Sequence, residues 1–257
     1  MIDISNIKTY GWEAAIRGMR NSRQSWEKSD SDWEDVSVIT SDGTGTMKTG
    51  EKIFRIGSKD LELASQLAAN GGSHAKFRRM IGVSMDICAP LYWWKEFDTY
   101  KIGTVANSTS TMYSIMNKKF TPDDFSTEHL LESRDSDSPV AIDIHGEECY
   151  YSPKYFVTDM LCQMLNFYRD LYLQCENNSE LRKQYWWQII QLLPSSYNQT
   201  RTVMMNYEVL SHIVHERWHH KLDEWRRFCK VALDKLPYAK ELIFCENLLL
   251  TMFTEFG

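Results

Sequence analysis

The sequence predicts an α+β protein with an antiparallel sheet, flanking long helices and a helix-rich C-terminal half. Two runs of strand composition, residues 36–40 and 51–57, are separated by a turn and indicate a hairpin. Alternating apolar residues between Phe77 and Cys88 indicate a further strand. From residue 155 onward, apolar residues recur at helical spacing almost to the end of the chain.

The composition limits the classes of protein to which this chain can belong. A hydrophobic content of 43% and a charged content of 25% are ordinary for a soluble globular protein. The net charge of −6 lacks the global basic field of a nucleic-acid-coating protein, and no apolar run is long enough to span a membrane. Six scattered cysteines without a CxxC pair, and no visible signal peptide, predict reduced thiols in a cytoplasmic protein.

The first half predicts short elements. Residues 10–21 fit an amphipathic helix, and the polar residues 21–34 fit a loop. Residues 58–72 predict a second helix, with Ser58 as its N-cap and Gly71 at its end.

An aromatic-rich helix after Pro90 leads into a hydroxyl-rich stretch. The chain passes Lys101 and a turn with one glycine before the polar residues 107–111. A lysine followed by hydroxyl groups and loop N–H groups can bind phosphate oxygens. An ordinary helix end with a Ser/Thr-rich loop has the same pattern, so both interpretations stay open.

Residues 121–153 are interpreted as an insertion or a lid. Thr121 and Pro122 begin a short helix, and the Ser/Asp-rich residues 132–139 are typical of a solvated, mobile segment. Further on, residues 195–206 predict a break that places Arg201 just ahead of a helix. The helices predicted in this half cover residues 156–175, 181–194, 207–222, 223–237 and 238–253.

Two groups of side chains are candidate sites. The histidines do not match HExxH, so surface or site-lining roles are favoured and no metal is expected; they are His212, His215, His219 and His220. The cations near element ends fit either a phosphate site or a solvated surface. They are Arg78, Arg79, Lys101, Arg201, Lys221, Arg226, Arg227 and Lys230. No nucleophile elbow, P-loop or dinucleotide motif is present in the sequence.

The stretch after the aromatic helix resembles the signature of the flavin-dependent (alternative) thymidylate synthases. That signature reads Arg-His-Arg, seven or eight residues, then Ser; here Thr99-Tyr100-Lys101 is followed after eight residues by Ser110. The family loop Asn-Glu-x-Ser-x-Arg-Tyr is similar to residues 107–113. Both signature arginines, its histidine, and the loop Glu and Arg are replaced, so the chain resembles a divergent member with a degenerate signature.

Other stretches are similar to the family in order and spacing. Residues 73–87 resemble its His-containing turn and the strand after it, and Arg201-Thr202-Val203 resembles the start of its long helix. His219-His220-Lys221 stands in place of the family's Asn-x-Arg, and Lys230 stands where the family has a substrate-activating Arg.

The resemblance implies a single domain of the thymidylate synthase complementing type over residues 1–257. It implies a homotetramer that binds FAD and methylates deoxyuridine monophosphate or a related pyrimidine nucleotide. NADPH and methylenetetrahydrofolate would be co-substrates, and Lys230 would polarise the pyrimidine. The implied substrate-binding residues are Glu96, Lys101, Ser108, Ser110 and Arg201. The implied FAD-binding residues are His74, Arg78, Thr99, Tyr100, Asn107, His219 and Lys221.

Three functions stay open at this point. The first is the flavin enzyme. The second is a catalytically inactive nucleotide-binding protein that keeps the fold, because lysine cannot reproduce the bidentate fork of arginine. The third is a structural or interaction protein that uses an aromatic-rich surface.

Overall fold

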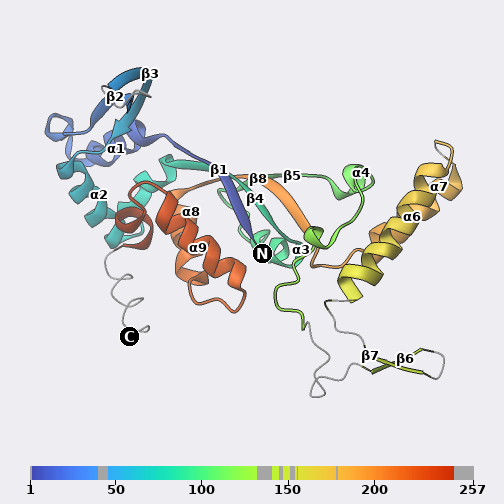
Figure 1. Ribbon diagram of the computed structural model, residues 1–257. Coiled ribbons are helices and arrows are strands. Elements are labelled where there is room, and N and C mark those ends of the chain that lie inside the picture. Colours follow the sequence, from blue (N-terminus) through green and yellow to red (C-terminus); the bar gives the residue numbers. More distant parts are fainter. Residues whose placement is uncertain are drawn as a thin grey trace. The chain divides into compact units, whose positions relative to one another are not determined.

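The computed structural model describes residues 2–39, 46–131, 141–144, 147–150, 154, 156–177 and 179–245 (Figure 1). The chain divides into two compact units, and each is described by itself. The first unit holds Met1–Asp3, Ile87–Thr99 and Asn107–Arg201. The second unit holds Ile4–Asp86, Tyr100–Ala106 and Thr202–Gly257.

A four-stranded sheet has the strand order β1-β4-β8-β5. Two hydrogen bonds show that β4 and β8 are antiparallel. The Tyr207 amide donates to the Ile81 carbonyl, and the Leu91 amide donates to the Tyr197 carbonyl, each at 3.0 Å. The strands are β1 (Asp3–Tyr10), β4 (Gly82–Pro90), β8 (Asn198–Asn206) and β5 (Val105–Ser108).

The alternating pattern correctly predicted the buried side of β4. Ile81, Val83, Met85 and Ile87 are at most 3% exposed. The predicted start of this strand at Phe77 is wrong, because residues 77–80 belong to the 3-10 helix η3 (His74–Met80). The helical turn prevails because it buries Ala75, Phe77 and Arg78 together.

Two predictions about irregular segments are also wrong. Most of residues 195–206, expected to be a break, forms β8, whose Val203 and Met205 are buried. Polar residues fill the first half of this strand and hide its alternation. The hydroxyl-rich stretch expected as a loop begins inside β5, a strand whose four residues are all exposed.

The predicted N-terminal helix, hairpin and second helix are confirmed. Helix α1 (Trp12–Arg20) and helix α2 (Ser58–Asn70) flank a hairpin of β2 (Asp32–Ile39) and β3 (Thr46–Arg55). The hairpin is antiparallel, with Trp33 opposite Phe54. Strand β2 begins inside residues 21–34, so the loop predicted there is shorter than expected.

The N-cap of α2 differs from the prediction. Gly57, not Ser58, occupies the cap position, and Asp30 supplies the capping carboxylate from a distant loop. Its oxygens accept hydrogen bonds from the amides of Lys59 at 3.0 Å and Asp60 at 3.1 Å. A cap that comes from 30 residues away leaves no local sequence pattern.

A buried ion pair joins α1 to α2. Arg20 Nε donates to Asp60 Oδ1 at 2.6 Å, and the two side chains are 6% and 0% exposed. The hydroxyls of Ser29 and Ser31 donate to Asp60 Oδ2, each at 2.6 Å. Burial raises the pKa of Asp60, but the hydrogen bonds from the two serines and Arg20 outweigh it, and the net pKa lies below its ordinary value.

The rest of the second unit is helical. Helix α8 (Tyr207–Arg217) ends before the predicted residue 222, and α9 (Asp223–Lys235) follows it. Trp225 and Phe228 of α9 are buried. A π-helical turn covers Lys240–Phe244, and the remainder of the helix predicted over 238–253 lies outside the described residues.

In the first unit, α3 (Leu91–Phe97) and the short α4 (Thr111–Ser114) precede a helical pair. That pair, α6 (Cys162–Gln174) and α7 (Glu180–Leu192), confirms the helices predicted over 156–175 and 181–194; a π-helical turn, Phe156–Leu161, precedes α6. The core of this part contains Ile115, Met116, Phe120, Phe125, Leu161, Cys162, Leu165 and Ile189.

The predicted insertion or lid is described only in part. Thr121 and Asp124 form a capping box around the 3-10 turn Pro122–Asp124, with the Thr121 amide donating to Asp124 Oδ2 at 2.8 Å. Residues 132–139 lie outside the described residues. Beyond them, β6 (Ala141–Ile144) and β7 (Glu147–Tyr150) pair antiparallel. None of the helices within the described ranges is long and apolar enough to cross a membrane.

Candidate functional site

The second unit contains a hollow of about 820 Å³ between the C-terminal half of α1, the helix α2 and η3. This volume is typical of small-molecule sites, which combine apolar walls with a few polar groups. Its apolar walls come from Met19, Leu63, Leu67, Phe77 and Met80. We name it the His74 hollow, because His74 is one of the FAD-binding residues implied by the family resemblance.

The polar groups of the His74 hollow favour an anion. Arg23, His74 and Lys76 line it, and no carboxylate is among the described residues that do so. Hydroxyl and amide side chains add short hydrogen-bond donors, and guanidinium and ammonium groups bind phosphate oxygens. These neutral polar residues are Asn21, Ser22, Ser25, Gln66, Asn70 and Ser73.

The buried Arg20–Asp60 pair fixes the walls of this hollow. It ties the last residue of α1 to the first turn of α2, and both helices line the cavity. Arg20 Nη1 also donates to the Ser25 carbonyl at 3.3 Å, which holds the turn that carries Arg23. At Gly18, an added Cβ would lie 3.1 Å from the sulfur of Met80, so the close packing of α1 on η3 favours glycine there.

Arg78 lies on the same 3-10 helix as His74 but points into the protein. Its side chain is 7% exposed and pairs with Glu208, with Nη2 to Oε2 at 2.7 Å. Nη1 donates to Ser211 Oγ at 3.0 Å and to the Leu242 carbonyl at 3.1 Å. Arg78 therefore joins η3 to α8 and the C-terminal turn, and it is not among the residues that line the His74 hollow.

Tyr100 lies in a polar cluster at the end of α8. Its hydroxyl donates to Glu216 Oε2 and accepts from Arg217 Nε, both at 2.8 Å. Burial, followed by the hydrogen bond to Glu216, raises the pKa of Tyr100 to about 12. The phenol is therefore neutral at physiological pH and acts as a hydrogen-bonding group. Sequence reasoning missed Glu216 and Arg217, which belong to the predicted helix but carry no motif of their own.

The other predicted site residues of the second unit lie at the surface. Lys101, His219, Lys221 and Lys230 are all exposed. Within the described part of the chain, no group of three or more His, Cys, Asp or Glu side chains is arranged to hold a metal ion.

The predicted site residue Arg201 is held by three side chains of the first unit. Its Nη1 donates to Asp98 Oδ1 at 2.7 Å, and its Nε donates to Gln199 Oε1 at 2.9 Å. Its Cζ lies 4.2 Å from the centroid of the Trp94 ring. Gln199 in turn donates to the Thr109 carbonyl at 2.9 Å, so Arg201 is connected to the residue before Ser110.

The remaining predicted site residues of the first unit lie on α3, β5 and α4 or at their ends. Thr99 Oγ1 donates to the Glu96 carbonyl at 2.7 Å and thereby closes the end of α3. Asn107 and Ser108 are exposed on β5. Ser110 is the N-cap of α4, and its hydroxyl accepts from the Tyr113 amide at 3.4 Å.

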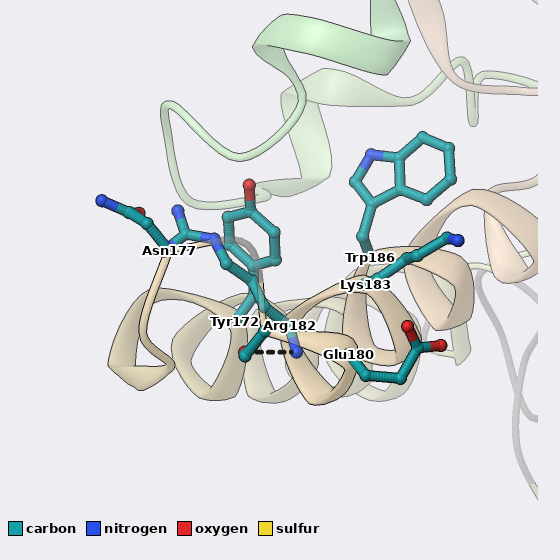
Figure 2. Close-up of a pocket in the computed structure, with 7 residues that line it drawn as sticks. Tyr172, Asn177, Glu180, Arg182, Lys183 and Trp186 are labelled. Atoms are coloured by element: carbon teal, nitrogen blue, oxygen red, sulfur yellow. Dashed lines mark hydrogen bonds between the residues drawn. The ribbon is translucent and has the colours of Figure 1, made fainter.

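A second hollow, of about 670 Å³, lies at the turn between α6 and α7 (Figure 2). Figure 2 shows the Arg182 guanidinium against the Tyr172 ring, and its Cζ lies 4.1 Å from the ring centroid. Arg182 Nη1 also donates to the Cys175 carbonyl at 3.0 Å. Glu180 lines this hollow beside Lys183, so it lacks the uniform positive charge of the His74 hollow.

Comparison with known proteins identifies the fold. No family model and no curated protein matches the sequence. Solved structures do match, and they give the chain the fold of the flavin-dependent thymidylate synthases, so the predicted α+β class is confirmed.

Two of these structures are of thymidylate synthase X (ThyX) from Helicobacter pylori, both with FAD and dUMP. The first is 17% identical, with a TM-score of 0.57, and the match covers 97% of this chain and 99% of that chain. The second is 18% identical, with the same TM-score, over 94% and 99%. At this identity the likeness concerns the fold.

Proposed function

We propose that the protein is a ThyX-like, FAD-dependent enzyme that methylates dUMP or a related pyrimidine nucleotide. Methylenetetrahydrofolate is the proposed one-carbon donor and NADPH the proposed reductant. The observation that carries the proposal is a cation-rich hollow, beside the predicted FAD-binding residue His74, in a chain with the ThyX fold. The proposal includes a cytoplasmic homotetramer and a single domain over residues 1–257.

The His74 hollow fits the diphosphate of FAD. Arg23 and Lys76 provide positive charge, and His74, Ser22 and Ser73 provide short hydrogen-bond donors. Bound FAD would supply hydride chemistry, which no amino-acid side chain provides. The role of this chain is then to hold the diphosphate and to keep the flavin in a fixed orientation.

Two predicted FAD-binding residues fit the cofactor less well. Arg78 is buried in its pair with Glu208, and the Tyr100 hydroxyl is held by Glu216 and Arg217. We keep in that role the predicted residues whose side chains are exposed. They are His74, Thr99, Asn107, His219 and Lys221.

For the pyrimidine nucleotide we propose the remaining predicted residues. Arg201 and Lys101 would bind the phosphate, and the Ser110 hydroxyl would donate to it. Glu96 and Ser108 complete this predicted set, and Lys230 would polarise the pyrimidine ring. The Arg201 guanidinium is positioned by Asp98 and Gln199.

A second function, nucleotide binding without turnover, is favoured by the replaced signature. Thr99 and Lys101 stand where the family has arginines, and a lysine offers a point charge in place of a bidentate fork. Such a protein would keep the fold and the nucleotide but lose the reaction. The third alternative, a structural protein, predicts that neither ligand binds.

One set of assays separates these functions. FAD binding is followed by flavin fluorescence, dUMP binding by thermal shift, and turnover by formation of dTMP with NADPH and methylenetetrahydrofolate. The enzyme predicts all three signals. A dUMP-dependent rise in melting temperature without FAD binding or dTMP supports the second function, because a ligand stabilises the state that binds it. If FAD binding, dUMP binding and dTMP formation are all absent, the flavin enzyme and the nucleotide-binding protein are both contradicted.

A further inference from the structure

A separate hollow lies at the other end of α1. It encloses about 750 Å³ between the first turn of α1, the base of the β2–β3 hairpin and the segment after α9. Among the described residues, none lines both this hollow and the His74 hollow. We name it the Trp33 hollow, and the proposed flavin enzyme assigns it no ligand.

Aromatic rings form the walls of the Trp33 hollow. The hairpin register places Trp33 opposite Phe54, and the two rings meet edge to face with centroids 5.5 Å apart. Trp12 and Tyr238 meet in the same manner at 5.6 Å. Trp33 and Tyr10 nevertheless remain 47% and 45% exposed. A planar ligand stacked against these rings would cover apolar surface that now faces water.

The polar groups of this hollow select among planar ligands. Glu13 Oε2 accepts from Trp33 Nε1 at 3.3 Å, so the carboxylate lies beside the indole edge. A carboxylate only accepts hydrogen bonds, and it therefore favours a ring that presents N–H donors. Lys52 and Arg55 also line the hollow and favour an anionic group on the same ligand.

We propose that the Trp33 hollow binds a guanine nucleotide. The guanine edge carries adjacent N–H donors, which match the two oxygens of Glu13, whereas adenine presents one donor group beside acceptors. The ring stacks on Trp33, and the phosphate pairs with Lys52. Arg55 already pairs with Glu34, Nε to Oε2 at 2.5 Å, across the exposed face of the hairpin. Lys52 stands opposite Asp35 in the hairpin register, on the face that also carries Trp33 and Phe54, and from that face it is the phosphate contact.

The test is calorimetric titration of the full-length protein with GMP and AMP, both with and without saturating FAD and dUMP. GMP binds about tenfold or more tightly than AMP, because one good bidentate pair discriminates to that extent. FAD and dUMP leave GMP affinity unchanged. Displacement of GMP by either ligand, or equal affinities for GMP and AMP, would overturn the proposal. Binding of tetramethylammonium in place of GMP would instead identify a cage for a quaternary cation.

Variants locate the GMP site. Trp33→Ala weakens GMP binding about tenfold or more through loss of stacking, and Trp33→Phe retains most of it. Trp187→Ala is the matched control, because Trp187 is similarly exposed at 43% but lies on α7. Glu13→Gln removes the preference for GMP over AMP. If Trp33→Ala and Trp187→Ala bind GMP equally well, the Trp33 hollow is not the site. Thermal melts confirm that each variant is folded.

Discussion

The two hollows of the second unit share helix α1 but differ in chemistry. The His74 hollow, at the C-terminal half of α1, has Arg23, His74 and Lys76 and no carboxylate among its described lining. The Trp33 hollow, at the N-terminal turn, has aromatic walls and the carboxylate of Glu13. One helix thus presents a cationic site at one end and an aromatic site at the other.

The difference follows from what packs against each end of α1. At the C-terminal half, η3 and α2 contribute His74, Lys76 and short polar side chains. At the N-terminal turn, the hairpin contributes Trp33 and Phe54 as a cross-strand pair. Aromatic cross-strand pairs stabilise hairpins, so the same contacts that hold β2 on β3 also make a surface for flat ligands.

Asp60→Ala has the largest expected effect on this arrangement. It leaves Arg20 buried without its partner, and breaking a buried ion pair costs about 3–5 kcal/mol. We expect urea denaturation to show this loss and FAD binding to weaken, because the pair holds both walls of the His74 hollow. Glu62→Ala, an exposed carboxylate on the same helix, is the control and should change stability little.

Asp60 also predicts a dependence of stability on pH. Its pKa is lower in the folded protein than its ordinary value of 3.8, so its stabilising contribution is present above pH 3.8. That contribution is lost as pH falls through the folded pKa. The pH dependence of the unfolding free energy below pH 4 should therefore be shallower in Asp60→Asn than in the wild type. Equal slopes would show that this carboxylate does not stabilise the fold.

Gly11→Ala has the next largest expected effect, because Gly11 lies between the Trp33 hollow and a residue that lines the His74 hollow. It lines the Trp33 hollow, and an added Cβ would lie 2.1 Å from the carbonyl oxygen of Met80, which lines the other. Its φ of 84° adds the cost of a left-handed residue. We expect a loss of about 3 kcal/mol by urea denaturation.

The control for this substitution is Gly72→Ala. Gly72 has a positive φ of 53°, but no atom lies within 4 Å of its added Cβ. At Gly72 the only expected cost is that of a left-handed backbone conformation for alanine, about 1–2 kcal/mol of the unfolding free energy. Equal losses at the two glycines would mean that α1 can move away from η3.

Lys76→Ala should affect the ligand of one hollow and leave the ligand of the other unchanged. Loss of one charge-assisted hydrogen bond to a diphosphate weakens FAD binding about tenfold. GMP affinity should not change, since Lys76 lines only the His74 hollow. Flavin fluorescence and calorimetry measure the two affinities, and Lys119→Ala, an exposed lysine of the first unit, is the control. An equal loss of affinity for FAD and GMP would show that the two ligands do not bind in separate hollows.

Lys101→Ala has the smallest expected effect. Lys101 is exposed, and a solvated charge contact contributes about 0.2–1 kcal/mol. We expect dUMP affinity to fall by a few-fold at low salt, with FAD and GMP affinities unchanged. Unchanged dUMP affinity, measured by thermal shift, would remove Lys101 from the nucleotide site.

The sequence predicted the helices of the protein better than its sheet. Apolar spacing identified α1, α2, α6 and α7, because each buries one face of a regular helix. Strands β1, β5 and β8 were not predicted. β5 has four exposed residues, and β8 opens with polar residues, so their pairing depends on partners that are distant in the chain.

The candidate site was predicted only through resemblance. His74 was identified from its position in the family's turn, and the structure places it in a cationic hollow. Arg23 and Lys76 were not predicted, because the ion pair that brings α1 onto α2 joins residues 40 positions apart. Arg78 and Tyr100 were predicted as FAD ligands from position alone, which does not reveal the partners that hold their side chains.

The most direct test of the account is hydrogen–deuterium exchange with and without FAD. Binding in the His74 hollow predicts slower exchange of the backbone amides in residues 18–25 and 73–77. Residues 9–14 and 52–55, which line the Trp33 hollow, should exchange at unchanged rates. Protection confined to the Trp33 hollow, or no protection at saturating FAD, would contradict the proposal that the cationic end of α1 is the flavin site.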